Sequence, residues 1–300
     1  MLAKYAVTAF ALGVVFAVPS RAEGGAAIPD FSGRWGRNAF NFEPIPGGPQ
    51  PVVNLSRMPD GTSNIGRLVG DYRNPILKPE TADIVKKKGE ISLSGHTYPD
   101  VSNQCRPYNP PFTLAMQLGL EMLQKKDGIT IIYNQDDQVR RVRLNASHPA
   151  KVKPSPMGDS VGHYEGDTLV VDTIGIAPGP YAMVDRYGSP VTNALHVVER
   201  FRLIDAVAAK EAQDRYEKID GHLGGEPGAM VLNPDTAIKG LQVYLTVEDP
   251  NVFTMPWSAY VTYRRVSAAQ PWLEQVCAEN PNEYYADRWV GLPKANTPDF

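Results

Sequence analysis

Hydrophobic and polar residues alternate along much of the chain after residue 112, and this alternation predicts β-strands. From Leu195 to Leu203 most apolar side chains fall on one face, while His196 and Arg200 fall on the other. The stretch Leu241–Val247 repeats the pattern. Strands are expected at 118–125, 129–134, 139–144, 161–164, 168–174, 195–203, 241–247 and 258–266.

Short polar turns connect several of these strands. Lys126-Asp127-Gly128 and Glu165-Gly166-Asp167 are typical of hairpins. A series of strands joined mainly by hairpins predicts a mainly β fold, an antiparallel meander that closes into a barrel or a strongly curved sheet.

The rest of the chain shows less regular patterns. Residues 23–112 are rich in proline and glycine and are expected to wrap over the core, with one short helix near 78–89. Residues 113–300 are expected to form the barrel, as one structural unit with the wrap. An excursion at 205–238 interrupts the meander, and its first part is a helix candidate that Asp205 caps and Gly221 ends. This excursion is a lid, a surface feature or a dimer contact.

The first 22 residues read as a secretory signal peptide. Lys4 is followed by an uncharged, largely apolar stretch, and Ser20 and Ala22 precede a cleavage site before Glu23. The apolar stretch is shorter than the roughly 20 residues of a membrane span. We expect a periplasmic or secreted mature protein without a membrane span.

The charge of the chain argues against nucleic-acid binding, and its cysteine content predicts a disulfide. The net charge of −3, with both signs interspersed, gives no basic face for nucleic acid. Cys105 and Cys277 are the only cysteines, and in an oxidising compartment they predict one disulfide.

Several segments together resemble a family of exported bacterial proteins of unknown function. They are Asp30–Trp35, Asn74–Pro79, Cys105–Pro107, Arg140–Val142, Ser160–Thr173, Leu195–Phe201, Glu248–Pro250, Pro256–Trp257 and Cys277–Asn280. The resemblance implies that the chain shares a single architecture with this family, but the family has no known activity to transfer to it. This chain departs from the family pattern at His163 and Tyr164, where the family more often has Arg and Trp, and in the excursion at 205–238.

A shorter motif is similar to lipocalin-like barrels. Gly33-Arg34-Trp35 resembles their Gly-x-Trp signature, and Arg264 or Arg265 is expected to stack on Trp35. Such a tryptophan closes one barrel end and leaves the other as a ligand mouth.

No strong catalytic, nucleotide-binding or metal-binding motif is present, so we expect no cofactor and no metal. His196 is a candidate general base if the polar face of its strand points into the barrel; otherwise it is hydrogen-bonded in the sheet or faces solvent. Glu199 lies on the apolar face and is either a catalytic acid or the partner of Arg141 or Arg143 in a salt bridge. Tyr164 is a candidate acid–base partner of His196.

Further candidate ligand contacts lie in strands and nearby loops. They are His148, His163, Arg141, Arg200, Tyr133, Tyr244 and Trp257. The aromatic members are equally consistent with core packing.

We therefore expect a periplasmic barrel that binds a small hydrophobic molecule. If it is an enzyme, cofactor-free hydratase, dehydratase, isomerase or lyase chemistry fits best. The alternative is a non-enzymatic envelope protein that binds a protein or glycan through the wrap, and it predicts a packed barrel interior. The oligomeric state is left open.

Overall fold

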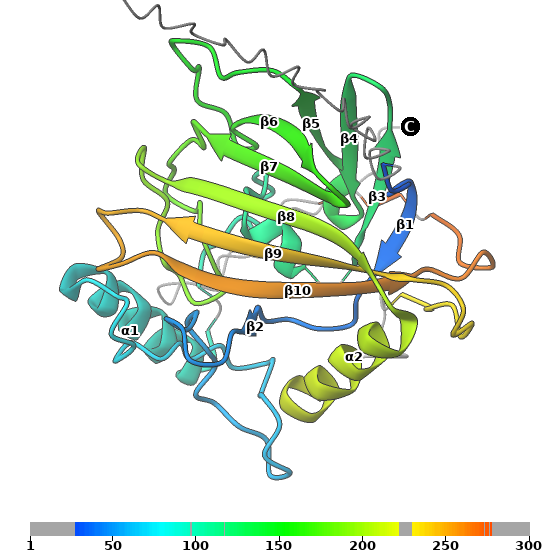
Figure 1. Cartoon of the computed structure of the whole chain (residues 1–300). Coiled ribbons are helices and arrows are strands. Elements are labelled where there is room, and N and C mark those ends of the chain that lie inside the picture. The colour runs from blue at the N-terminus through cyan, green and yellow to red at the C-terminus, as the bar shows by residue number, and fades with distance from the viewer. Residues whose placement is uncertain are drawn as a thin grey trace, which may run out of the picture.

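The protein is a closed, mainly β barrel, as the alternation predicts (Figure 1). This computed structural model describes residues 28–96, 98–116, 118–221 and 230–272, with Glu274, Gln275 and Cys277; the predicted signal peptide lies outside them. The barrel strands are β1 (Gly33–Gly36), β3 (Leu120–Gln124), β4 (Gly128–Tyr133), β5 (Gln138–Leu144), β6 (Asp159–Glu165), β7 (Thr168–Ile174), β8 (His196–Ile204), β9 (Gly240–Glu248) and β10 (Trp257–Arg265). The short β2 (Glu43–Pro44) pairs with β10.

The strands follow the chain order around the barrel, and β1 closes the ring between β3 and β10. Neighbouring strands are antiparallel except β5 and β6, which are parallel, with Val142 opposite Ser160. The connection at 145–158 returns along the barrel before β6 begins, so the barrel is mixed at this one pairing.

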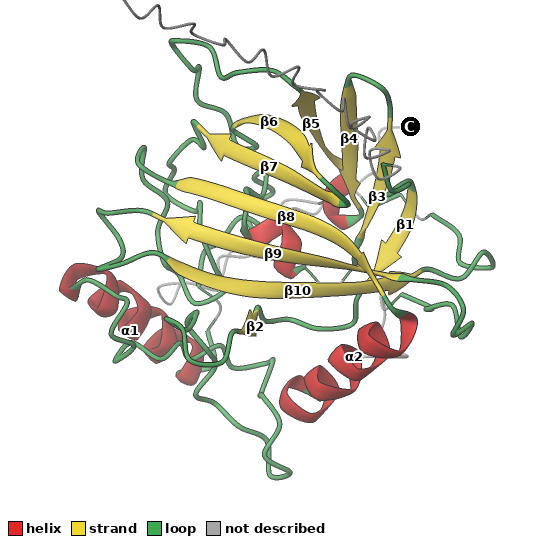
Figure 2. Ribbon diagram, in the orientation of Figure 1, coloured by secondary structure: helices red, strands yellow, loops and turns green. Residues whose placement is uncertain are grey.

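The two helices begin close to where the sequence predicts them (Figure 2). In α2 (Ala206–Asp220), the Asp205 side chain accepts a hydrogen bond from the backbone N–H of Val207 at 2.8 Å, and Gly221 follows with a φ of 83°. The other helix, α1 (Pro79–Leu93), continues past Gly89, so the predicted end at this glycine is wrong; Gly89 instead packs closely on Val69. The glycine serves helix packing rather than helix termination.

The apolar faces of the strands point into the barrel. On β8, Val197, Glu199 and Phe201 are fully buried, whereas His196 and Arg200 lie on the outer face. The condition for a catalytic His196, a polar face that points inward, is therefore not met. Burial of the apolar row drives this choice of face, because each large apolar side chain gains about 1.5–3 kcal/mol when it leaves water.

One end of the barrel is closed as the lipocalin-like motif predicts. The guanidinium of Arg265 stacks 3.7 Å from the centre of the Trp35 ring, and the Trp35 side chain is fully buried. Nearby, the amide of Gln124 donates to the hydroxyl of Tyr164 at 3.0 Å. Tyr164 thus belongs to the closed end, far along the strands from His196.

The opposite end, where the motif predicts a ligand mouth, is covered by the wrap. The short helix η1 (Phe112–Ala115) is buried there, and the backbone oxygen of Leu114 accepts a hydrogen bond from the Tyr263 hydroxyl at 2.7 Å. Residues 176–190 cover the same end, with Met183, Val184 and Tyr187 in the core. The barrel interior is packed with side chains.

Candidate functional site

Glu199 forms a buried ion pair inside the barrel, but its partner is neither Arg141 nor Arg143. Both oxygens of Glu199 accept hydrogen bonds from the guanidinium of Arg140, and both side chains are about 1% exposed or less. Arg140 shares the inward face of β5 with Val142, whereas Arg141 and Arg143 are exposed. Glu199 is thus held as a structural carboxylate.

Two aromatic candidates are core residues. Tyr133 is 1% exposed and its hydroxyl lies 3.2 Å from Arg140. Trp257 is also 1% exposed and packs edge-on against Phe253. Both side chains fill the barrel interior.

The outer wall of the barrel carries a chain of ionisable side chains that runs from β5 to β8. Arg143 donates two hydrogen bonds to Asp159, both at 2.9 Å. His148 bridges two carboxylates, with Nδ1 2.6 Å from Asp159 and Nε2 3.0 Å from Asp172. The second oxygen of Asp172 lies 3.1 Å from Nε2 of His196. The network ties four strands and the 145–158 connection together.

The contacts shift the ionisation of this network. The hydrogen bond with Asp172 raises the pKa of His196, and the same bond lowers the pKa of Asp172. Burial works to raise the pKa of Asp159, but hydrogen bonds from Arg143 and His148 lower it. Asp172 therefore orients His196 as an acid–base group would be oriented. His196 is 37% exposed on the outer surface of the barrel. Its contact with Asp172 therefore connects two strands and does not form an enclosed reaction site.

The remaining candidates lie on the outer surface without forming one site. Arg200 donates to Glu165 at 2.6 Å, and the other oxygen of Glu165 lies 3.0 Å from His163. Tyr244 packs against Tyr260 at 5.4 Å between ring centres. Tyr164 lies between His163 and Glu165 on β6 but packs against the core, whereas His163 and Glu165 are exposed on the outer face.

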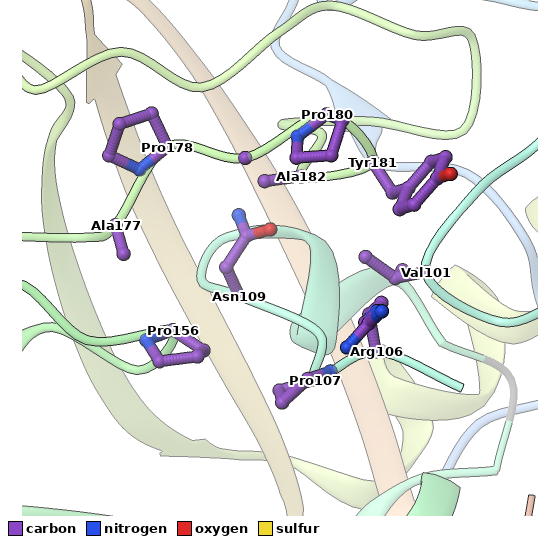
Figure 3. Close-up of a pocket in the computed structure, with 11 residues that line it drawn as sticks. Val101, Arg106, Pro107, Asn109, Pro156, Ala177, Pro178, Pro180, Tyr181 and Ala182 are labelled. Carbon is purple, nitrogen blue, oxygen red and sulfur yellow. The ribbon is translucent and has the colours of Figure 1, made fainter. Parts of the chain in front are cut away.

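A pocket that sequence analysis did not identify lies where the wrap meets the 176–190 segment. It has a volume of about 360 Å³, within the range of roughly 300–1,000 Å³ that is typical of small-molecule sites. Figure 3 shows Asn109 between Val101 and Tyr181 on one side and Ala177 and Pro156 on the other. The lining residues are Val101, Arg106, Pro107, Asn109, Pro156, Ala177, Pro178, Gly179, Pro180, Tyr181 and Ala182.

Asn109 gives this largely apolar pocket one buried polar group. Its side-chain nitrogen donates to the backbone oxygens of Pro110 at 2.9 Å and Met183 at 3.0 Å. These bonds fix the amide, which is 1% exposed, and leave Oδ1 without a partner among the described residues. A buried acceptor without a donor is costly, by about 1–3 kcal/mol. A donor on a ligand would remove that cost.

The disulfide holds one wall of the pocket. Cys105 and Cys277 are bonded, as predicted; they are 172 positions apart in sequence, and their Cα atoms are 5.5 Å apart. Cys105 directly precedes Arg106 and Pro107, which line the pocket. The bond therefore limits the movement of this wall relative to the C-terminal segment.

No family model, curated protein or solved structure matches this chain. Within the described residues, no group of three or more histidine, cysteine, aspartate or glutamate side chains is arranged to hold a metal ion. The same part of the chain contains no helix with the length and hydropathy of a membrane span.

Proposed function

We propose that the protein is exported and binds a small, largely apolar molecule in the pocket around Asn109. The observation that carries the proposal is an apolar pocket of about 360 Å³ with one fixed, unpartnered acceptor, Asn109 Oδ1. Apolar walls with few polar groups are typical of small-molecule sites, where the polar group sets orientation. A ligand with one hydroxyl or amide donor on an apolar body fits this arrangement.

The proposed ligand site differs from the one expected of a lipocalin-like barrel, in which the ligand enters through the open end. The ligand binds between the wrap and the 176–190 segment, outside the packed barrel. Export is supported by the signal-like N-terminus and by the disulfide, because disulfides persist in oxidising compartments.

A pocket-filling variant tests this assignment. Ala177 lines the pocket, and Ala177→Trp places a large side chain there. The neutral fluorescent probe N-phenyl-1-naphthylamine should bind the wild type at one site, and Ala177→Trp should weaken binding at least tenfold. Ala208→Trp, an exposed alanine on α2, is the control and should bind as the wild type does.

Native mass spectrometry of the protein purified from its own periplasm identifies the natural ligand. A retained apolar molecule that is lost in Ala177→Trp but kept in Ala208→Trp supports the proposal. Absence of both a retained molecule and probe binding contradicts it, as does an equal loss in the two variants.

The packed interior favours a second function, binding of a protein or glycan partner through the wrap. A photo-crosslinker at Met58 in the wrap, which is 45% exposed, should then capture a defined partner in cells. Val139 on the barrel, 42% exposed, is the matched control site. Equal capture from both positions contradicts this function.

A further inference from the structure

Lys88 on α1 is buried and forms no salt bridge with any residue that the structure describes. Its side chain is among the buried polar groups at 6% exposure, although lysines are almost never buried unless paired. Nζ contacts the sulfur of Met183 and lies 4.1 Å from the centre of the Tyr98 ring. Among the described residues, no carboxylate oxygen lies within 4.0 Å of Nζ. The amine thus contacts a thioether sulfur and an aromatic ring in place of a counter-ion.

The fold leaves a specific space for this side chain. Gly188 has a φ of 98°, and a Cβ at this position would overlap the carbon stem of Lys88. The turn around Gly188 is fixed by Asp185, which accepts hydrogen bonds from the backbone N–H groups of Tyr187 at 2.8 Å and Ser189 at 3.4 Å. The buried position of the lysine is therefore part of the local structure.

The same lysine, in the C-terminal half of α1, lines a cavity of about 190 Å³. A protein cavity of roughly 150 Å³ suffices for a benzene molecule. The lining residues are Ile65, Gly66, Leu68, Lys88, Ser92, His96, Tyr98, Asp100 and Arg186. None of them lines the Asn109 pocket, so this cavity is a different site.

We propose that Lys88 is a nucleophilic amine that captures a small aldehyde or ketone in this cavity as an imine. The neutral Nζ attacks the carbonyl carbon, a C–N bond forms as the carbonyl π bond breaks, and a proton lost by the nitrogen goes to the oxygen. The resulting carbinolamine then loses water as the nitrogen lone pair forms the C=N bond. The products are one imine and one water, and hydrolysis reverses the reaction without any oxidant or reductant.

Burial makes the neutral amine available. Loss of hydration lowers the pKa of Lys88 to about 8, while Asp100 and Asp185 partly oppose the shift. The other ionisable side chains that face the cavity are His96, Tyr98 and the cationic Arg186, and no second lysine lies among them. At pH 7 the neutral fraction is then on the order of a few hundred times that of an ordinary lysine.

Lys87 is the matched internal control, because it is the exposed neighbour of Lys88 on the same helix. The full chain is treated with benzaldehyde and sodium cyanoborohydride at pH 8, and the reduced adducts are quantified by peptide mapping. Lys88 should be modified at least tenfold faster than Lys87 in the folded protein, and the two rates should become equal in concentrated urea. Modification of Lys88 at or below the rate of Lys87 in the folded protein overturns the proposal.

A pH series and a conservative variant separate this role from simple accessibility. The rate at Lys88 should fall about tenfold between pH 8.5 and pH 7, whereas a pH-independent rate contradicts a titrating amine. Lys88→Arg keeps a cation and should remove the cavity adduct while Lys87 reacts as before. If total labelling is unchanged in Lys88→Arg, the nucleophile is another residue and the proposal is wrong.

Discussion

Replacement of Glu199 by glutamine removes the only carboxylate that neutralises Arg140 inside the described part of the barrel. Arg140 is fully buried, and burial works to lower the pKa of its guanidinium, but the charge of Glu199, the contact with Tyr133 and the hydrogen bonds with both together raise it. The variant therefore leaves a buried cation without its counter-charge. Breaking a buried pair in this way costs about 3–5 kcal/mol.

The expected change in thermal stability follows from the size of the protein. For domains of this size, 1 kcal/mol shifts the melting temperature by about 2–4 °C. Glu199→Gln should thus lower the melting temperature by roughly 6–20 °C. Urea unfolding followed by circular dichroism measures the free energy directly.

The double variant Arg140→Met with Glu199→Leu tests whether uncompensated charge is the cause. Replacing both partners by apolar residues is often neutral. Here Ser160 and Thr173 also lose Arg140 as a hydrogen-bond donor, so a residual loss of about 1–3 kcal/mol is expected. The double variant should therefore be more stable than Glu199→Gln.

A control on the same strand separates buried from exposed pairs. Arg202 on β8 faces outward, 4.0 Å from Asp167, with a side chain that is 59% exposed. Arg202→Met should cost less than about 1 kcal/mol. A cost for Glu199→Gln as small as that of Arg202→Met would refute the reasoning, as would equal losses in Glu199→Gln and the double variant.

Two further predictions concern the outer wall and the closed end. Because Asp172 raises the pKa of His196 above its ordinary 6.5, the stability from this contact is fully present below pH 6.5 and is lost as pH rises through the raised value. The difference in urea midpoint between wild type and His196→Gln should therefore be larger at pH 5.5 than at pH 9, and the same or larger difference at pH 9 contradicts the assignment. Arg265→Ala removes the stacking on Trp35 and a 2.7 Å hydrogen bond to the Ser32 backbone oxygen, and should cost about 2–3 kcal/mol in urea unfolding. Arg265→Lys should recover less than half of this loss because an ammonium lacks the planar face, and full recovery would mean that charge alone matters.

The barrel was predictable because each strand buries one face, so side-chain alternation reports strand position directly. The helix at 206–220 was predictable because its capping residue and its terminal glycine are local signals. The parallel pairing of β5 and β6 depends on the path of the 145–158 connection. That path is set by contacts distant in sequence, such as the one between His148 and Asp172.

The hydrophobic pattern of the sequence did not predict that η1 and residues 176–190 cover the end of the barrel where a ligand mouth was expected. The segment around Phe112 and Leu114 has no strand or helix periodicity, and its burial results from packing against Tyr263. The Asn109 pocket likewise combines loops around Pro156 and Tyr181 that no spacing in the sequence relates. The lipocalin-like motif predicted one end of the barrel but not the segment that covers the other.

Two buried cations could have been found from periodicity. Arg140 shares the alternate positions of Val142 and Leu144, and that parity places it inside the barrel. Lys88 follows Thr81 and Val85 on the buried face of α1, at the spacing of an amphipathic helix. Both cost free energy to bury, and Glu199 neutralises the charge of Arg140 within the core. Lys88 has no such partner among the described residues but borders a cavity. In the first arrangement the two buried charges neutralise each other, whereas the second is the one that we propose reacts with a carbonyl compound.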